Sequence, residues 1–444
     1  MPDVIVVGGG LAGMAAAAAL GSAGLRVTLL EARPYLGGRA SSFPLPGEHD
    51  SKEFIDNCQH VLLGCCENLL DLYERLGVRD RIRFFDEYYF LEPGGRLSVL
   101  RPGRLPPPLH MSGSLVRLKF LDARAKLAVL RALAQMRRER RRADLDRITM
   151  REWLARAGQT QVAVDRFWRP VLVSAVNEEL DRMAARHGFQ VFLLAFLGSR
   201  RACRLGLPAV PLGSLYAPEV WAKFPNVTIR LRAPARRLLV EGDTAVGVEV
   251  DGERLTASYL VVALPFERLA AIAPQAGVNT DGWEHSPITG IHLWFDRRVT
   301  DLPYAALLDR TIQWFFDKSG GSYLQVVVSA SRHLLHRSRS EIVNLAVREL
   351  AEFLPGVRPA RLERAYVVKE LRATFSASPL AERQRPGTET KLRNLYLAGD
   401  WTRTGWPATM EGAVRSGYLA AEAVTEAAGR PQRFLVARDS GLLR

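Results

Sequence analysis

The glycine pattern that follows Val4 to Val7 constrains the fold more than any other part of the sequence. Those four residues form a continuous β-branched run, which is typical of a parallel strand buried on both faces. Gly8, Gly10 and Gly13 come next, with the spacing G-x-G-x-x-G. Gly8 permits a tight turn, Gly10 lets the backbone approach a pyrophosphate, and Gly13 lets the next helix lie close to the strand.

The residues after these glycines complete a nucleotide-binding unit. Met14 to Leu20 is alanine-rich and predicts a helix, whose N-terminus would direct free N–H groups toward a phosphate. Arg26 to Leu30 predicts a second strand, and Glu31 ends it 18 residues after Gly13, where a carboxylate can accept hydrogen bonds from both ribose hydroxyls. This order of elements indicates a Rossmann-type fold. Glu31 also argues against a ribose 2′-phosphate, because two anions would face each other.

Two further motifs extend this site. Gly37, Gly38 and Arg39 suit a second approach to a pyrophosphate, with the guanidinium supplying charge-assisted hydrogen bonds. Near the other end of the chain, Asn394 to Asp400 predicts a strand that ends in Gly-Asp, and Trp406 to Gly417 opens a long helix. Together these motifs resemble the flavin amine-oxidase and carotenoid-desaturase superfamily, whose members bind FAD through them.

The resemblance implies how FAD would be held. Gly399 and Asp400 would meet the pyrophosphate and the ribityl chain, while Thr409 and Met410 would offer backbone amides to the flavin ring. A helix N-terminus at that place favours the anionic reduced flavin. Ala235 falls where flavoproteins of this group hold the adenine with a backbone amide. The implied cofactor contacts are Gly8, Gly10, Leu11, Ala12, Gly13, Glu31, Ala32, Arg33, Gly37, Gly38, Arg39, Asn57, Gln59, His60, Ala235, Gly399, Asp400, Thr409 and Met410. No cysteine lies in the C-terminal motif, so a covalent flavin link is not expected there.

A narrower resemblance covers most of the chain. It rests on Asp56 to His60 (Asp-Asn-Cys-Gln-His), Trp168 to Asn177, Ile291 to Asp296 and Pro407 to Gly417. These stretches are similar to the squalene-associated FAD-dependent desaturases, which are hydroxysqualene dehydroxylases of bacterial hopanoid synthesis. The resemblance implies an enzyme that removes the hydroxyl of hydroxysqualene reductively and gives squalene.

Three alternatives stay open at this point. The nearest is a carotenoid desaturase of the phytoene type, which would use the flavin oxidatively. Another is an amine oxidase, which would need an aromatic cage and an amine-specific pocket. The third is a non-catalytic carrier of prenylated proteins, against which the intact flavin-facing motif at the C-terminus argues.

Dehydroxylation would need an acid and a dry cavity. A prenyl-type alcohol can ionise once its oxygen is protonated, and an apolar tunnel would exclude water from the cation. We take His60 as the candidate catalytic acid, because its segment is expected to border the flavin. His60 and Asn177 are polar residues in apolar surroundings, and a substrate hydroxyl would give them a hydrogen-bond partner. The alternative is that both side chains bond to backbone groups.

The remaining pattern predicts an α/β fold with α+β insertions. A meander is expected from Arg236 to Glu241, Thr244 to Val250 and Arg254 to Leu264, and an antiparallel sheet from three runs between residues 288 and 329. We predict a Rossmann-type FAD-binding domain made of residues 1–80, 226–280 and 390–430. Residues 81–225 and 281–389 would form a substrate domain with a helical cap and an antiparallel sheet, as in amine oxidases and desaturases.

Composition excludes some classes of protein. The four cysteines show no C-x-x-C spacing, which fits neither a disulfide framework nor a zinc site and suggests a reducing compartment. No metal is expected. Net charge is +14, but aromatic residues are not interleaved with the basic ones as a single-strand nucleic-acid binder would need. We therefore expect no nucleic-acid partner. The resemblance implies a hydrophobic isoprenoid substrate, and the sequence does not identify the electron donor.

One basic and apolar stretch bears on localisation. Ser114 to Arg142 combines leucines with many arginines and ends in a run of five arginines around Glu139. It predicts either a surface helix that packs its leucines on the core or an interfacial helix on anionic lipid. No basic leader with a cleavage site precedes the first strand, and the apolar run from Phe189 to Leu197 is too short to cross a bilayer. The expectation is a cytoplasmic protein, peripheral on the inner face of the cell membrane.

Overall fold

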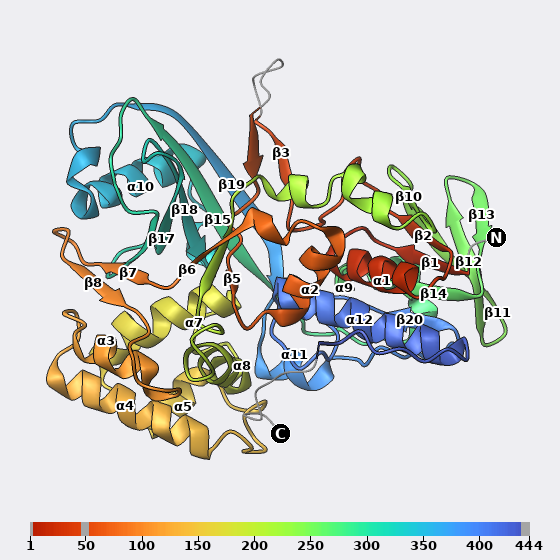
Figure 1. Ribbon diagram of the computed structural model, residues 1–444, viewed down its shortest axis with the longest axis horizontal. Coiled ribbons are helices and arrows are strands. Elements are labelled where there is room, and N and C mark those ends of the chain that lie inside the picture. Colours follow the sequence, from red (N-terminus) through yellow and green to blue (C-terminus); the bar gives the residue numbers. More distant parts are fainter. Residues whose placement is uncertain (1–2, 46–52, 437–444) are drawn as a thin grey trace.

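A computed structural model describes residues 3–45 and 53–436 of the chain (Figure 1). Its first layer is a five-stranded parallel sheet with the order β10-β2-β1-β14-β20. The strands are β1 (Val4–Val7), β2 (Val27–Leu30), β10 (Val227–Arg230), β14 (Tyr259–Val262) and β20 (Leu395–Leu397). They come from all three segments expected to bind the nucleotide, and we propose that these segments form one domain.

Two helices from opposite ends of the chain pack on each other beside this sheet. They are α1 (Leu11–Ser22) and α12 (Met410–Ala427), which lie side by side in Figure 1. A Cβ at Gly417 would stand 2.1 Å from the carbonyl oxygen of Ala12, so the close approach of α12 to α1 requires glycine there. The predicted first strand, first helix and C-terminal helix are all confirmed.

The predicted third strand of the meander, Arg254 to Leu264, is wrong as one element. The structure divides it into β13 (Glu253–Thr256) and β14, and only β13 joins β11 (Ala235–Glu241) and β12 (Thr244–Val250). The side chain of Asn394 fixes the division, because it donates to the carbonyls of Ala245 and Ser258, 2.7 Å away in each case. β14 is nearly all apolar and pairs with β1 in the centre of the parallel sheet, a preference that its local pattern does not reveal.

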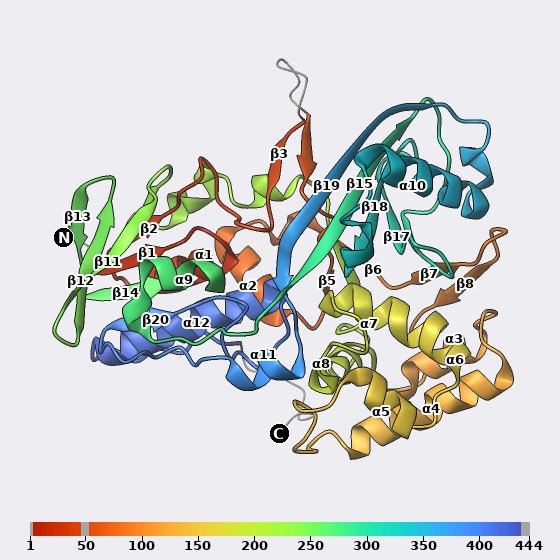
Figure 2. The ribbon, with the colours of Figure 1, turned by 180° about the vertical axis from the view of Figure 1, so that it is seen from behind.

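The second layer is a seven-stranded sheet with the order β19-β15-β18-β17-β16-β7-β8. It is antiparallel except where β16 pairs with β7, so the predicted antiparallel sheet is confirmed. Helix α10 (Arg339–Phe353) covers one face of it, as Figure 2 shows. The strands are β7 (Tyr88–Leu91), β8 (Leu97–Leu100), β15 (His285–Phe295), β16 (Tyr304–Leu307), β17 (Trp314–Ser319), β18 (Tyr323–Ser329) and β19 (Leu362–Phe375).

A helical layer closes the lower part of the molecule in Figure 1. Its helices are α3 (Ser112–Val116), α4 (Ala123–Arg138), α5 (Met150–Arg156), α6 (Gln161–Ala163), α7 (Arg169–Val176) and α8 (Ala185–Gln190). Buried aromatic rings hold this layer together, with the centroids of Trp168 and Phe192 4.7 Å apart. Helix α4 buries Ala125, Val129, Ala132 and Met136 and leaves Leu127 48% exposed, so the leucines are not its main core face.

Smaller elements connect the layers. They are β3 (Ser42–Pro44), β4 (Phe54–Asp56), β5 (Leu62–Leu63), α2 (Glu67–Leu76), β6 (Ile82–Phe85), β9 (Leu205–Pro208), α9 (Phe266–Ile272) and α11 (Pro379–Gln384). β9 pairs with both β5 and β6, and α2 ends at Gly77 in the left-handed conformation. Within the described ranges, no helix combines the length and the apolar character needed to cross a membrane.

Candidate active site

A cavity of about 570 Å³ lies where the parallel sheet, the seven-stranded sheet and the helical layer meet. Of the predicted cofactor contacts, all but Gly13 and Ala235 line it. The predicted contacts that line the cavity are Gly8, Gly10, Leu11, Ala12, Glu31, Ala32, Arg33, Gly37, Gly38, Arg39, Asn57, Gln59, His60, Gly399, Asp400, Thr409 and Met410. Residues almost 400 positions apart in the sequence therefore meet around one space.

The three glycines of the first motif have different surroundings. Gly8 has φ +109°, which a side chain would strain, and a Cβ at Gly13 would stand 1.8 Å from the carbonyl oxygen of Gly8. Gly13 thus serves the contact between α1 and β1 and does not line the cavity. At Gly10 a Cβ would meet only the Cα of Gly38, at 3.9 Å. The protein leaves that side of Gly10 open, which fits a pyrophosphate lying against the backbone.

Glu31 is held in place by two backbone amides. Its Oε2 accepts a hydrogen bond from the N–H of Gly9, and its Oε1 accepts one from the N–H of Arg33, both at 2.8 Å. Each carboxylate oxygen can accept a further bond. The side chain is 9% exposed at the edge of the cavity, a geometry suited to two ribose hydroxyls.

Glu31→Ala should weaken FAD binding by about 1.5–3 kcal/mol for each charge-assisted bond that is lost. The expected result is a raised dissociation constant when the apoprotein is titrated with FAD and flavin fluorescence is followed. Glu349→Gln, at a buried carboxylate outside the cavity lining that accepts from the N–H of Ile312, is the comparison for general destabilisation. Unchanged affinity in Glu31→Ala would mean that Glu31 does not accept from the ribose.

Arg39 joins the two ends of the site. Its Nη2 lies 2.5 Å from Oδ1 of Asp400, and its Nη1 donates to the carbonyl of Ala373. Burial acts against the charge of Arg39, but the attraction and hydrogen bond of Asp400, together with the charges of Glu267 and Glu370, outweigh it and raise the pKa of Arg39. The guanidinium therefore stays charged beside the expected pyrophosphate.

The N-terminus of α12 also borders the cavity. Thr409 caps it by accepting a hydrogen bond from the N–H of Gly412 at 3.1 Å. Glu411 turns away to cap α2, where it accepts from the N–H of Leu69 and from the side-chain amide of Asn68, both at 2.8 Å. Its burial raises the pKa of Glu411. The first amides of α12 are thereby fixed at the cavity wall, where they favour negative charge.

Asn57 supplies an unused acceptor. Its amide nitrogen donates to the carbonyl of Arg39 at 2.7 Å, whereas its buried Oδ1 has no hydrogen-bond partner among the described residues. A buried acceptor without a partner is costly, and an N–H or O–H of a bound cofactor would satisfy it. This orphaned oxygen and the open side of Gly10 are two independent observations that fit FAD.

His60 lines the cavity as a neutral ring. Its Nδ1 is 2.9 Å from the carbonyl of Cys58, so Nδ1 carries the proton and Nε2 keeps its lone pair. Burial is the largest influence on the ring and lowers the pKa of His60 below its usual 6.5. The bond to a nearby carbonyl that sequence reasoning left as an alternative is therefore present. To act as an acid His60 would need a second proton, which burial disfavours.

Asn177 lines the cavity, and its side chain is hydrogen-bonded within the protein. Its amide nitrogen donates to the carbonyl of Ser286 and to Oγ1 of Thr374, and its oxygen accepts from the N–H of Ala330, all within 2.9 Å. Every strong bond of the amide group lies within the protein. The alternative that sequence reasoning left open, bonding within the protein, is therefore present, and these bonds join the end of α7 to the seven-stranded sheet.

Ala235 lies away from the cavity. It begins β11 and pairs with Val250, and it is not among the residues that line the space. Two residues before Ala235, the backbone N–H of Ala233 donates to the carbonyl of Glu31 at 2.9 Å, which joins this segment to the nucleotide-binding unit. The expected contact of Ala235 with adenine finds no support in this geometry.

The other end of the cavity is apolar. Aromatic and aliphatic side chains from β7, α7, the segment after α8, β15, β17 and β18 line it, namely Tyr88, Phe90, Val171, Val191, Phe196, Ile288, Trp314, Phe316 and Val327. The polar tips of two of these rings are already bonded: Trp314 Nε1 donates to Ser174 Oγ at 2.7 Å, and the Tyr88 hydroxyl donates to the carbonyl of Cys203. A ligand there meets mainly hydrocarbon and ring faces.

Sequence reasoning missed several residues that line the cavity. Trp401, Trp406, Arg268, Glu370 and Gln190 are among them. Alternation along β17 separates lining residues from core residues, because Trp314 and Phe316 line the cavity while Phe315 lies in a separate core cluster.

Three thiols border the cavity as well. Burial raises the pKa of Cys58 to about 12, and the contact with Cys65 together with burial raises the pKa of Cys66 well above its usual range. Protonated thiols are poor nucleophiles. The surroundings therefore favour a flavin that is held without a covalent link to Cys58 or Cys66.

Comparisons with known proteins agree with this geometry. The family described as flavin containing amine oxidoreductase matches residues 11–425. The 15-cis-phytoene desaturase of Synechococcus elongatus is 26% identical over 99% of this chain and 98% of its own length. A hydroxysqualene dehydroxylase of Sinorhizobium fredii is 28% identical over 95% and 97%. The solved structure of putrescine oxidase bound to putrescine superposes with a TM-score of 0.70 at 17% identity, covering 96% of this chain and 99% of that one.

Proposed function

Since the chain belongs to the flavin-containing amine oxidoreductase family and is an FAD-dependent oxidoreductase, we propose that it removes the hydroxyl of hydroxysqualene reductively and gives squalene, a step of hopanoid synthesis. The observation that carries the proposal is the apolar end of the cavity, which is continuous with the expected FAD contacts. A long isoprenoid chain fits walls of hydrocarbon and aromatic rings. The dehydroxylase of Sinorhizobium fredii, similar over almost the whole chain, supports the reaction type.

We propose that the predicted cofactor contacts that line the cavity hold FAD. Glu31 would bind the ribose, and Arg39 and the first amides of α12 would lie near the negative charges of the cofactor. Reduced FAD, when bound, supplies a hydride. The chain's own residues would do the rest: the apolar walls keep water from the cation, and the faces of Trp314 and Phe316 stabilise positive charge. The protonated form of His60 would donate to the leaving hydroxyl, which departs as water.

A desaturase of the phytoene type is the second candidate. It is favoured by the 26% identity to the desaturase of Synechococcus elongatus over 99% of this chain. The two reactions use the flavin in opposite directions, so one experiment separates them. Hydroxysqualene with reduced FAD under nitrogen should give squalene, and phytoene with oxidised FAD should give no product. Desaturated carotenoid without squalene would overturn the proposal and favour the second candidate.

Dehydroxylation should depend on pH through His60. Since its pKa is lowered below 6.5, the acid form is present only at lower pH. The rate constant kcat/KM should therefore be highest in mildly acidic buffer and fall about tenfold per pH unit above the lowered pKa. His60→Gln should lower kcat/KM and abolish its fall with rising pH. His333→Gln is the matched control, because burial also lowers the pKa of His333 but that residue does not line the cavity. An unchanged profile in His60→Gln would exclude His60 as the acid.

We also propose a cytoplasmic location on the inner face of the cell membrane. Four large apolar side chains between β8 and the middle of α4 are about half exposed, namely Leu105, Leu109, Val116 and Leu127. Exposed arginines and lysines surround them in the sequence, as anionic lipid requires. The final arginine run is partly neutralised, since Arg142 pairs with Glu139 and Asp144.

Binding to anionic vesicles at low salt should depend on both features. Replacing Arg137, Arg138, Arg140, Arg141 and Arg142 with Gln should weaken binding by up to about 1 kcal/mol per charge. Leu105→Gln with Leu109→Gln should weaken it further, whereas Leu371→Gln, equally exposed but elsewhere, should not. Co-sedimentation measures this. If the wild-type protein does not co-sediment with such vesicles, the proposed location is wrong.

A further inference from the structure

A second cavity, of about 670 Å³, lies behind the wall of the first. The wall is the segment that leads from β5 into α2. Gly64 and Leu70 line the second cavity, whereas their neighbours in the sequence line the cofactor cavity, namely Leu62, Leu63, Cys65, Cys66 and Leu69. The two spaces are thus separated by a single stretch of chain.

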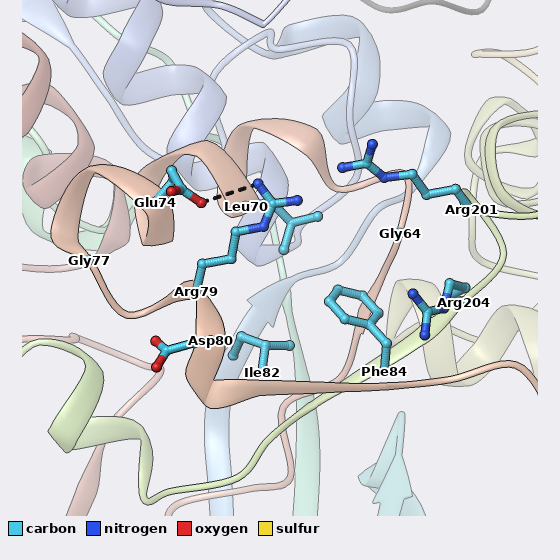
Figure 3. Close-up of a pocket in the computed structure, with 10 residues that line it drawn as sticks. All are labelled: Gly64, Leu70, Glu74, Gly77, Arg79, Asp80, Ile82, Phe84, Arg201 and Arg204. Carbon is cyan, nitrogen blue, oxygen red and sulfur yellow. Dashed lines mark hydrogen bonds and ion pairs between the residues drawn. The ribbon is translucent and has the colours of Figure 1, made fainter.

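Three arginines surround the second cavity (Figure 3). Arg79 comes from the turn after α2, and Arg201 and Arg204 come from the turn before β9; all three direct their guanidinium groups toward the same space. Arg79 lies 3.3 Å from Glu74, and Arg204 lies 3.1 Å from Asp86. Both acidic side chains are more than half exposed. Within the described part of the chain Arg201 has no ion-pair partner.

The floor of this cavity is apolar. Leu70, Ile82 and Phe84 form it, and the guanidinium of Arg204 lies 5.2 Å from the centroid of the Phe84 ring. Stacking on the ring orients Arg204; its Nε lies against Asp86, and its Nη groups are the ones it offers to a ligand. The rim holds three guanidinium groups and the carboxylates of Glu74 and Asp80, so it keeps a net positive charge above an aromatic and aliphatic floor. Such a rim suits a ligand that has both an anionic and an apolar part.

We propose that this second cavity binds a small phosphate-bearing molecule, whose aromatic or apolar body lies on Leu70, Ile82 and Phe84. Guanidinium groups bind phosphate oxygens in a bidentate manner, and a phosphate carries more charge than the exposed carboxylates it would displace. A nucleotide and a prenyl diphosphate share this chemistry. The site lies outside the cavity of the proposed reaction, so it stands or falls independently of that reaction.

Isothermal titration calorimetry on the FAD-loaded protein tests the proposal, because bound FAD already fills the main nucleotide site. The probes are inorganic phosphate, ADP and geranyl diphosphate, each against sodium chloride of equal ionic strength. The variant Arg79→Gln/Arg201→Gln/Arg204→Gln removes the rim, and Phe84→Ala removes the ring. Arg83→Gln is the matched control, since Arg83 lies between Ile82 and Phe84 on β6 but stacks on Phe85 and does not line the cavity.

ADP or geranyl diphosphate should bind at least about tenfold more tightly than phosphate, and whichever binds tighter identifies the body. The triple variant should lose at least about tenfold in affinity, Phe84→Ala should lose the advantage over phosphate, and Arg83→Gln should bind like the wild type. Flavin absorbance reports whether each variant keeps FAD and its fold; if the triple variant does not, the exposed Arg201→Gln alone is used. No heat above the salt control, or equal binding by the arginine variants, would overturn the proposal. Equal affinity for phosphate and the organic ligands would overturn the role of the apolar floor.

Discussion

Gly10→Val should abolish FAD binding while leaving the apoprotein as stable as the wild type. Gly10 has φ −76° and ψ 178°, a conformation that valine adopts without strain. A Cβ there contacts nothing closer than the Cα of Gly38 at 3.9 Å, so the new side chain would occupy the space of the pyrophosphate. We expect the FAD dissociation constant to rise by at least about a hundredfold, or about 2.7 kcal/mol. Fluorescence titration of the apoprotein measures the affinity, and urea unfolding of the apoprotein measures the stability.

Gly13→Ala is the counterpart of this variant. Its Cβ would stand 1.8 Å from the carbonyl oxygen of Gly8, a backbone atom that cannot move aside without shifting β1 or α1. The apoprotein itself should lose about 1–3 kcal/mol of stability, or more. If Gly10→Val still binds FAD normally, the pyrophosphate does not pass Gly10 and the assignment of the cavity is wrong.

Arg385→Met should lower the free energy of unfolding by about 3–5 kcal/mol and release FAD. Arg385 is fully buried, and its guanidinium donates to the carbonyls of Asp400, Thr402 and Trp406. It therefore fixes the loop that brings Asp400 and Thr409 to the cavity. Removing it leaves those carbonyls and the carboxylate of Glu382, 2.9 Å away, without their cation.

The control for this variant is Arg383→Met, which changes an exposed arginine on the same helix α11 and should alter stability by less than about 0.5 kcal/mol. Burial acts to raise the pKa of Glu382, but His187 and Arg385 outweigh it and lower the pKa to about 2. A lowered carboxyl pKa contributes stability that is present above the unfolded value of 4.5 and is lost as pH falls toward 2. Without Arg385 this loss should begin at higher pH. Equal unfolding curves for the two arginine variants would contradict the role of Arg385.

The cofactor end of the site could be predicted because its signals are local. Glycine at a tight turn, a helix that begins after it and an acid at a strand end are each legible within a few residues. Gly8, Gly10, Glu31 and Arg39 all line the cavity for this reason.

The apolar end could not be predicted in the same way. Tyr88, Val171 and Trp314 come from β7, α7 and β17, and only the tertiary fold brings them together. The hydrogen-bond partners of buried polar residues could not be predicted for a related reason. Asn177 stood out among apolar neighbours, but its partners Ser286 and Thr374 lie more than 100 residues away in the sequence, so their bonds to it were invisible.

The predicted strand boundaries and buried helix faces differ from the structure where contacts with neighbouring elements decide them. The run from Arg254 to Leu264 has continuous strand character, yet it serves two sheets because β14 pairs with β1 and β20. Helix α4 has leucines at helical spacing, yet alanines, Val129 and Met136 form its buried face. In both cases the local pattern permits two packings, and the neighbouring elements select one.

Anaerobic single turnover is the most direct test of whether this protein removes the hydroxyl of hydroxysqualene reductively. The protein carrying chemically reduced FAD is mixed under nitrogen with hydroxysqualene in detergent, and flavin absorbance is recorded while the organic phase is analysed. The expected result is that oxidised-flavin absorbance returns as squalene forms, one molecule for each flavin, and that the flavin stays reduced when phytoene is added instead. Flavin that stays reduced in the presence of hydroxysqualene, together with desaturation of phytoene by the oxidised enzyme, would contradict it.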